Sequence, residues 1–252
     1  MNISYNKLYY SEDDFIAYIN HSYPKNNIGV VWFGGLNSDM NGTKASKLSS
    51  YSQQNKINFC KFDYFGHGKS SGDIEDGTIS KWLENGLSVI DNICKGHLIL
   101  VGSSMGGWLA LLCSLQRKKR IKGIIILAPA VDMTERLMWD EFTSIEKIEL
   151  ESHGSVKRYS KKYDSNYIIT EKLIIDGRNH LLLNDRIKVD FPVRIIHGML
   201  DEAVPWELSL DIGRRIKSQN IKTLLIKDAD HSLSRQSDMR LLFSNIEELI
   251  NK

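Results

Sequence analysis

Cysteine, proline and long apolar runs are all scarce in this 252-residue sequence, which has three cysteines and four prolines. Cys60, Cys94 and Cys113 lie in apolar segments and form no C-x-x-C pair, so we expect buried free thiols rather than a disulfide or a metal site. No run of about eighteen apolar residues is present, so stable membrane insertion is not expected. None of the prolines marks a linker between domains.

An excess of one charge sign is also missing. The sequence has 33 basic and 31 acidic residues and a formal net charge of +2, so no overall field would attract nucleic acid or an anionic membrane. Basic residues gather at 117–122 and 157–162, where a solvated surface is the favoured interpretation. We therefore expect no nucleic-acid partner.

Signals for targeting and for cofactor binding are missing as well. Residues 1–5 lack the basic and then apolar pattern of a signal peptide, which favours a cytoplasmic protein. No G-x-G-x-x-G opens a helix, and no spacing of His, Asp and Glu indicates a catalytic metal. The sequence therefore predicts no cofactor and no metal.

Short apolar runs rich in β-branched residues recur along the chain and are typical of buried parallel strands. They lie at residues 28–33, 57–62, 97–101, 123–127, 193–197 and 221–226. Segments with helical spacing lie between most of them, for example at residues 46–54, 82–93 and 107–115. This alternation predicts one α/β domain over residues 1–252, with a doubly wound, mostly parallel sheet. Residues 3–10 and 14–20 are expected to add an antiparallel edge.

The alternation breaks at about residues 131–190, which we expect to form a small, mainly helical cap insertion. A helix is predicted at residues 134–152, followed by an irregular, tyrosine-rich segment. An apolar stripe at helical spacing, which is more typical of a core-covering face than of a ligand surface, is made by Met138, Phe142, Ile145 and Ile148. A cap helix could do both.

The segment Gly102-Ser103-Ser104-Met105-Gly106 follows an apolar run and opens a helical one. In a G-x-S-x-G turn between strand and helix, the central serine is strained and its hydroxyl is exposed. The two glycines permit the close backbone approach that so tight a turn needs. A Gly/Ser loop between two elements is the alternative, so the interpretation of Ser104 as a nucleophile depends on its partners.

A serine nucleophile needs a histidine to take its proton and a carboxylate to orient that histidine. Enzymes with this turn have the acid and then the base after later strands. Asp201 follows the predicted strand at 193–197 and is the predicted acid, with Glu202 as the alternative. His231 follows the strand at 221–226 and is the predicted base.

Two further histidines need an interpretation. His197 lies on a predicted strand, where a hydrogen-bonded core or edge imidazole is favoured. His67 follows a strand but precedes Ser104 in the chain, so we interpret it as shape and support for the site rather than as its base.

The oxyanion of an acyl-transfer intermediate needs two backbone N–H donors. Met105, the residue after the serine, is predicted to supply the first. The loop Gly34-Gly35-Leu36 follows the strand at 28–33, and we predict the second donor at Leu36, with Gly35 as the alternative.

Five motifs occur in this order along the chain: the Gly34-Gly35-Leu36 loop, Gly66-His67-Gly68, the serine turn, His197-Gly198 with Asp201, and Asp230-His231. Together they resemble the α/β-hydrolase superfamily over nearly the full chain. Within it, residues 38–45, 62–64 and 101–108 are similar to the mitochondrial branch of palmitoyl-protein thioesterases and acyl-glucuronide esterases. That resemblance implies cleavage of S-acylated cysteines or activated acyl esters.

The sequence therefore predicts a serine hydrolase that cleaves acyl thioesters or carboxylic esters through an acyl-enzyme intermediate. Its partner would be a small-molecule or acylated-protein substrate. A non-catalytic binding module on the same fold is one alternative, and a hydrolase of carbon-carbon or amide bonds is another. The oligomeric state has no signature in the sequence.

Overall fold

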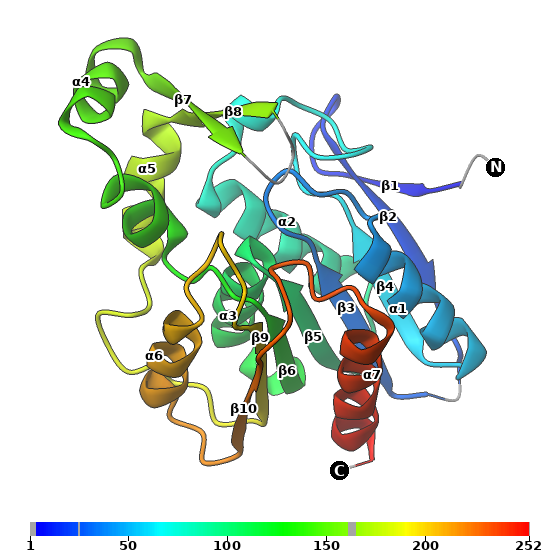
Figure 1. Ribbon diagram of the computed structural model, residues 1–252. Helices are drawn as coiled ribbons and strands as arrows, with labels where there is room; N and C mark the ends of the chain where they lie inside the picture. Colours follow the sequence, from blue (N-terminus) through cyan, green and yellow to red (C-terminus); the bar gives the residue numbers. More distant parts are fainter. Residues whose placement is uncertain (1–3, 25, 161–164, 252) are drawn as a thin grey trace.

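The computed structural model describes residues 4–24, 26–160 and 165–251. Its centre is an eight-stranded sheet with the strand order β1-β2-β4-β3-β5-β6-β9-β10 (Figure 1). These strands are β1 (Asn6–Tyr9), β2 (Phe15–His21), β3 (Ile28–Phe33), β4 (Asn58–Phe62), β5 (His97–Ser103), β6 (Ile121–Leu127), β9 (Val193–Gly198) and β10 (Ile221–Ile226). Strand β2 pairs antiparallel with both β1 and β4, and the remaining neighbours in this sheet, in the order β4-β3-β5-β6-β9-β10, pair in parallel. The predicted mostly parallel sheet with an antiparallel edge is confirmed.

Helices cover both faces of the sheet, as a doubly wound fold requires. They are α1 (Thr43–Gln54) and α7 (Gln236–Ile250) on one face, and α2 (Ile79–Asn92), α3 (Met105–Gln116) and α6 (Glu207–Arg215) on the other. Because successive strand residues point to opposite faces, β5 contributes to both cores. Leu98 and Leu100 pack with α2 and α3, whereas Ile99 and Val101 pack with α1 and α7.

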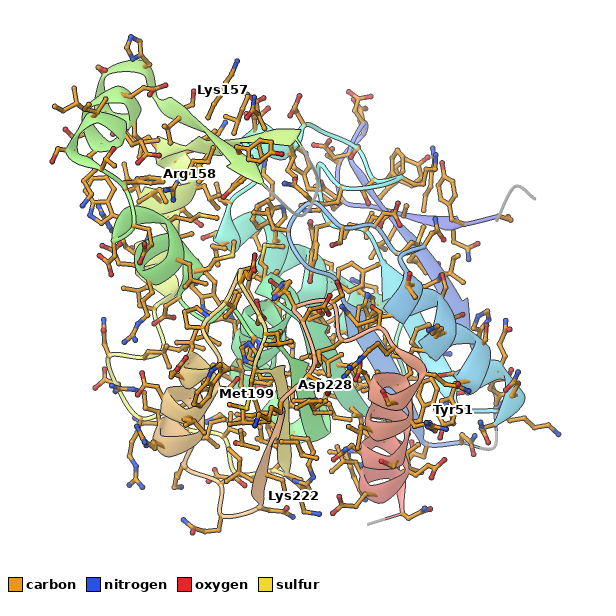
Figure 2. The ribbon with its side chains drawn as sticks, in the orientation of Figure 1. Tyr51, Lys157, Arg158, Met199, Lys222 and Asp228 are labelled. Atoms are coloured by element: carbon orange, nitrogen blue, oxygen red, sulfur yellow. The ribbon has the colours of Figure 1, made fainter. Side chains whose placement is uncertain are left out.

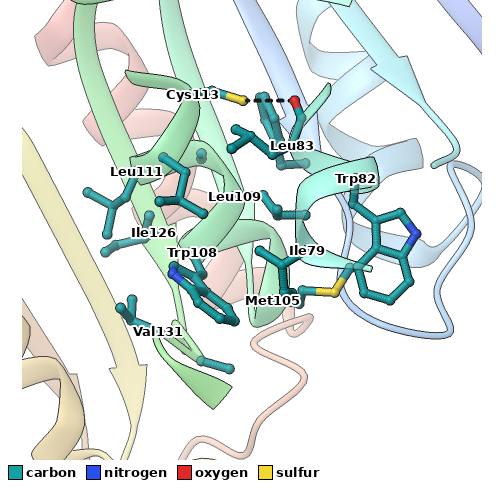
Figure 3. Packing of buried hydrophobic residues seen from close by; sticks show 14 of the residues in the cluster. Ile79, Trp82, Leu83, Met105, Trp108, Leu109, Leu111, Cys113, Ile126 and Val131 are labelled. Carbon is teal, nitrogen blue, oxygen red and sulfur yellow. Dashed lines mark hydrogen bonds between the residues drawn. The ribbon is translucent and has the colours of Figure 1, made fainter. Parts of the chain in front are cut away.

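Helix α3 is the most deeply buried helix of the described chain, with every residue from Met105 to Ser114 buried. A helix that is apolar on all sides needs protein contacts on all sides. Figure 3 shows Trp108 beside Val131, and Met105 between Trp108 and Trp82, so α3 lies against both α2 and the segment after β6. The start of α3 is therefore held in a fixed position relative to the sheet.

The strand order reverses between β3 and β5. From β3 the chain crosses through α1 to β4 on one side, and from β4 it returns through α2 to β5 on the other side of β3. Ligands in open parallel sheets bind at such a switch point, outside the carboxyl ends of the strands. Strand β3 ends at the Gly34-Gly35-Leu36 loop, and β5 ends directly before Ser104.

The segment between β6 and β9 departs from the predicted helix at 134–152. It contains a π-helix η3 (Thr134–Trp139), α4 (Ser144–His153), the hairpin of β7 (Ser155–Ser160) and β8 (Ser165–Thr170), α5 (Glu171–Gly177) and a 3-10 turn η4 (Arg178–His180). The helix is interrupted because Thr143 forms a capping box with Glu146 and starts α4 anew. The tyrosine-rich segment, expected to be irregular, is in part an antiparallel hairpin whose Val156 and Ile169 are paired and buried.

The predicted apolar stripe is wrong for half of its members. Met138 and Phe142 are buried, at 6% and 5% exposed, but Ile145 and Ile148 are 77% and 64% exposed. The restart at Thr143 changes the angular relation between the two helices, so the spacing along the sequence no longer corresponds to one face. The prediction of a cap over residues 131–190 stays a prediction.

Arginines of both basic clusters have structural partners. Arg117 pairs with Asp91 at 2.6 Å, and Arg120 donates to the carbonyls of Cys94 and Gly96 in the turn between α2 and β5. Figure 2 shows Lys157 and Arg158 on the hairpin, and Arg158 pairs with Glu146. Residues 161–162 of the second cluster lie outside the described residues. The three cysteines are buried free thiols, as predicted, and none of the described helices is both long and apolar enough to cross a membrane.

Asp132 joins the two ends of the segment between β6 and β9. It is 1% exposed and has a left-handed φ of 58°. Its two carboxylate oxygens accept the backbone N–H groups of Leu182 and Leu183, each at 2.8 Å. Trp108 of α3 donates to the carbonyl of His180 at 3.2 Å, which fixes the same end of the segment to the core.

We expect Asp132→Asn to lower the free energy of unfolding by about 1–3 kcal/mol, because it deprives one buried N–H of its acceptor while asparagine still tolerates the left-handed backbone. Urea unfolding measures the change. Asp185→Asn is the matched control, because Asp185 is exposed in the same segment and should stay within about 0.5 kcal/mol of the wild type. Equal effects of the two substitutions would contradict this role of Asp132.

Candidate active site

Ser104 is the single residue between β5 and α3, and its backbone is strained, with φ 56° and ψ −123°. A non-glycine residue in such a region costs of order 1–3 kcal/mol and persists only when its surroundings fix it. Here the Ser104 N–H donates to the carbonyl of Leu127 at 2.9 Å, and its carbonyl accepts from Ala130 at 3.1 Å. Strand β6 therefore holds the turn from one side.

The glycines of the turn are required by close packing. A Cβ on Gly102 would lie 2.2 Å from the carbonyl oxygen of Gly106, and a Cβ on Gly106 would lie 2.2 Å from the carbonyl oxygen of Phe33. Both distances are far below a van der Waals contact. Only glycine at both positions lets α3 start this close to the ends of β5 and β3.

Asp201 and His231 meet where the loops after β9 and β10 run side by side. The N–H groups of Met199 and Leu200 donate to the carbonyls of Ile226 and Ala229, which joins the two loops; Figure 2 labels Met199 and, on the neighbouring loop, Asp228. His231 Nδ1 donates to Asp201 Oδ2 at 2.6 Å.

The Asp201 side chain is fully buried and that of His231 is 14% exposed. Glu202, the alternative acid, is exposed.

Asp201 remains an ionised acid in spite of its burial. Burial alone would raise the pKa of this carboxyl, but hydrogen bonds from His197 and His231 outweigh burial and hold the pKa well below its ordinary value. The second oxygen, Oδ1, accepts the backbone N–H groups of Ala203 and Val204, each at 2.8 Å. Four N–H donors thus stabilise one carboxylate.

Sequence reasoning missed the contact of His197 with this carboxylate. The predicted core imidazole is indeed fully buried, but its Nε2 lies 3.0 Å from Asp201 Oδ2. The spacing of four positions between His197 and Asp201 could have indicated this contact, because a histidine near the end of a strand lies close to a residue in the turn that follows. Gly198 permits this turn, since a Cβ there would lie 2.2 Å from the carbonyl oxygen of Ala229.

Ser104, Asp201 and His231 all follow carboxyl ends of parallel strands, β5, β9 and β10. They therefore lie along the same edge of the sheet. Within the described chain, Asp201 and His231 are joined by a hydrogen bond, whereas the Ser104 hydroxyl makes none with His231. Ser104 is partly exposed.

The Gly34-Gly35-Leu36 loop lies against the serine. A Cβ on Gly35 would be 3.4 Å from the Cβ of Ser104. In the described part of the chain, the backbone N–H groups of Gly35, Leu36 and Met105 have no hydrogen-bond partner. The predicted donors Leu36 and Met105 are thus unoccupied, and Gly35 remains the alternative to Leu36.

Two buried side chains of the loop after β4 hold the segment that begins with the Gly34-Gly35-Leu36 loop. His67 Nε2 accepts the N–H of Asn37 at 3.3 Å, and Asp63 accepts the N–H groups of Met40 and Lys69 at 2.6 Å and 2.8 Å. Asn37, directly after Leu36, has a left-handed φ of 57°.

The ring of His67 is held in one tautomer. Its Nδ1 donates to the carbonyl of Phe65 at 3.1 Å, so Nε2 is the acceptor for Asn37. Burial lowers the pKa of His67, which favours this neutral form. These contacts agree with the interpretation of His67 as support for the site.

Residues 25–174 match the family model described as serine aminopeptidase, S33. The chain belongs to this α/β-hydrolase family. The mitochondrial palmitoyl-protein thioesterase ABHD10 of Bos taurus is 35% identical over 227 residues, which are 89% of this chain and 73% of that protein. The human protein of the same name is 35% identical over 225 residues, again 89% and 73%.

Two solved structures agree with this assignment. The mouse α/β-hydrolase domain-containing protein 10 has a TM-score of 0.90 at 32% identity over 99% of both chains. A putative hydrolase from Agrobacterium vitis has a TM-score of 0.92 at 33% identity over 98% of both chains. The family predicted from the motifs is confirmed, and so is the prediction of an enzyme of the ester and thioester hydrolase class.

The prediction of a cytoplasmic protein is wrong. The relatives from cattle, mouse and human are all named as mitochondrial. The expectation depended on the lack of a signal-peptide pattern, which is a feature of secretion and does not distinguish between compartments inside the cell.

Asp63 should make stability depend on pH, because burial raises its pKa to about 6 from the ordinary 3.8. A raised pKa means that the folded protein holds this proton more tightly than the unfolded chain does. The stabilisation is complete below pH 3.8 and is lost as the pH rises through about 6. The free energy of unfolding of the wild type, minus that of Asp63→Asn, should therefore fall across this range and be constant above it.

Urea unfolding at a series of pH values measures this difference. Asp13→Asn, which changes an exposed carboxyl, is the control and should follow the wild type throughout. A difference between wild type and Asp63→Asn that stays flat from the acid end to neutral pH would show that the pKa of Asp63 is the same in the folded and unfolded states and would contradict this prediction.

Proposed function

We propose that this protein cleaves acyl thioesters and carboxylic esters, with Ser104 as nucleophile, His231 as general base and Asp201 as the acid that orients His231. The observation that carries the proposal is the 2.6 Å hydrogen bond from His231 Nδ1 to Asp201 Oδ2, at the same sheet edge as a strained serine. That bond leaves His231 Nε2 as the basic nitrogen, which is the arrangement that a general base needs.

In the first half-reaction, Ser104 Oγ attacks the acyl carbonyl carbon while its proton passes to His231 Nε2. The carbonyl oxygen becomes an oxyanion, for which the free N–H groups of Met105 and Leu36 are the donors. The tetrahedral intermediate then breaks its bond to the leaving group, which takes the proton from His231. The products are the free thiol or alcohol and an acyl ester on Ser104.

In the second half-reaction, water replaces the serine as nucleophile. His231 takes a proton from the water as its oxygen attacks the acyl carbon, and the same N–H groups hold the oxyanion. Breakage of the ester bond returns the proton from His231 to Ser104 Oγ. A carboxylic acid leaves, and the enzyme is restored.

The relatives support acyl thioesters as one substrate class, since the bovine and human proteins are named palmitoyl-protein thioesterases. A cysteine thiol has an ordinary pKa of about 8.5, so a thiolate leaves more easily than an alkoxide and needs less help from an acid. The same residues therefore serve thioesters and activated esters.

We infer that residues 131–190 form a cap beside this site. Their entry is bonded to the nucleophile itself, through the N–H of Ala130 and the carbonyl of Ser104. Their exit is bonded to α3 through Trp108 and His180. Apolar side chains of the segment that remain partly exposed, including Leu137, Trp139 and Leu182, supply surface for an acyl chain.

Amide cleavage is the second candidate, because the matching family is described as serine aminopeptidases. An amine is a poorer leaving group than a thiol, and it must receive a proton as it departs. A series of substrates with one acyl group as thioester, ester and p-nitroanilide compares these functions directly. We expect turnover to fall in that order.

Ser104→Ala should abolish ester and thioester turnover, with a loss of about a thousandfold or more, and leave the thermal unfolding midpoint nearly unchanged. A fluorophosphonate probe followed by peptide mapping should label Ser104 in the wild type. Ser103→Ala, one residue earlier, is the matched control, and the probe should still label Ser104 in this variant. Labelling at Ser103, or retained turnover in Ser104→Ala, would contradict the proposed nucleophile.

The Gly34-Gly35-Leu36 loop, which carries the proposed second N–H donor, is tested through His67, since main-chain donors survive substitution of their own side chains. His67→Phe keeps a ring but removes the acceptor of the Asn37 N–H, so the donor at Leu36 should lose its alignment. We expect kcat to fall about tenfold or more, with a smaller change in KM. His97→Phe is the control, because His97 starts β5 at the opposite edge of the sheet. Equal kinetics of both variants would show that His67 does not support the loop.

A further inference from the structure

A second histidine contacts the proposed catalytic acid. His197, one residue before the end of β9, is fully buried, and its Nε2 lies 3.0 Å from Asp201 Oδ2 and 3.1 Å from the carbonyl oxygen of Val204. Its Nδ1 lies 2.6 Å from Ser209 Oγ, on α6. Both ring nitrogens therefore have partners, and Asp201 Oδ2 is shared by two imidazoles.

The partners assign the proton on His197. A carboxylate and a carbonyl oxygen can only accept, so Nε2 must carry the proton and donate. The Nδ1 of the neutral ring is then an acceptor, and the Ser209 hydroxyl donates to it. A neutral His197 satisfies every polar group of this buried cluster.

We propose that His197 is a positioning residue that holds Asp201 in place and takes a share of its negative charge, which limits how strongly Asp201 favours the protonated form of His231 once that ring has taken the proton of Ser104. This inference rests on the proposed function, and it adds a fourth side chain to the three that the mechanism uses. His197 touches neither substrate nor Ser104, so it acts through Asp201.

The physical reason is competition for one oxygen. Each donor to a carboxylate oxygen draws charge toward itself and weakens the attraction that the other donor feels. Without His197, the full charge of Oδ2 would face His231 and favour its protonated form. A base that keeps its proton too firmly is inactive over a wider range of pH.

Among the hydrogen-bond partners of His197, Asp201 is the charged one. The paired residues on β10 and the adjacent residues on β6 are apolar, and α6 contributes the Ser209 hydroxyl. Other charged groups on the elements around the pair include Glu202 and Asp230, both exposed, Asp228 and Arg235, which pair with each other, and Asp211, which pairs with Arg136 and Arg215. Arg194 on β9 and Lys222 on β10 both pair with Glu248. The group also includes Lys122 on β6, Glu207 and Arg214 on α6, Lys227 after β10, and Lys44, which donates to the carbonyl of Ser232.

Two substitutions at His197 separate the hydrogen bond at Nδ1 from the contacts at Nε2. Asparagine has an amide that reaches the place of Nδ1, so His197→Asn keeps the contact with Ser209 and loses the donor to Asp201. Glutamine is longer by one methylene and has an N–H at the reach of Nε2, so His197→Gln restores that donor. The experiment measures kcat/KM and kcat against pH for a p-nitrophenyl ester, per active site titrated with a fluorophosphonate.

We expect His197→Asn to move the acidic limb of kcat/KM about half a unit to one unit toward higher pH and to lower kcat about tenfold, with KM within about twofold. His197→Gln should return the limb toward the wild-type position. A purely structural role would lower the unfolding midpoint and the titratable fraction and leave the limb in place. An unmoved limb in His197→Asn, or the same shift in both variants, overturns the proposal.

Ser209→Ala keeps the test decisive if His197→Asn does not fold. Without the serine hydroxyl, the tautomer with the proton on Nε2 is less favoured, so a smaller shift in the same direction is expected. Histidine-ring NMR supplies a readout without turnover, since the pH at which the His231 ring signals change should rise in His197→Asn and in Ser209→Ala but return toward the wild-type value in His197→Gln. A wild type that fails to react with fluorophosphonate contradicts the proposed function, whereas a reactive wild type with unshifted variants contradicts the role of His197 alone.

Discussion

The hydrogen bond of a buried carboxylate to backbone N–H groups is the interaction on which the rest of the site depends. In the part of the chain that the structure describes, three carboxylates at the carboxyl edge of the sheet each accept two backbone N–H groups. Asp63 fixes the loop that follows β3, Asp132 joins the two ends of the segment between β6 and β9, and Asp201 orders its own turn after β9. Loops cannot be held by a sheet ladder, so each of them needs such an acceptor to keep a fixed geometry beside Ser104.

The sheet and the proposed triad could be predicted from the sequence because each depends on local chemistry. Buried parallel strands need continuous β-branched runs, and a serine in a strained turn needs glycines on both sides. The order of Ser104, Asp201 and His231 along the chain then limits the candidates to residues that follow strands. Glu202 was excluded by exposure, which a sequence does not contain.

The structure of the segment between β6 and β9 was harder to predict from the sequence, because two local signals compete there. The apolar spacing from Met138 to Ile148 indicates one long helix, but Thr143 and Glu146 form a capping box, which satisfies two backbone donors and restarts the helix. The contact of His197 with Asp201 was missed because it, too, depends on more than local sequence. A strand histidine is usually a core side chain, and its contact with Asp201 requires the turn at Gly198, which depends on tertiary packing against Ala229.

The three buried carboxylates also show how the number and kind of donors decide charge. Asp63 and Asp132 each accept two backbone N–H groups, and burial still raises the pKa of both. Asp201 accepts two backbone N–H groups and two imidazoles, and its pKa lies below the ordinary value. Since two backbone donors do not compensate for burial in the first two cases, the imidazoles account for the difference. His197 therefore helps to keep Asp201 charged, while it shares the oxygen on which His231 depends.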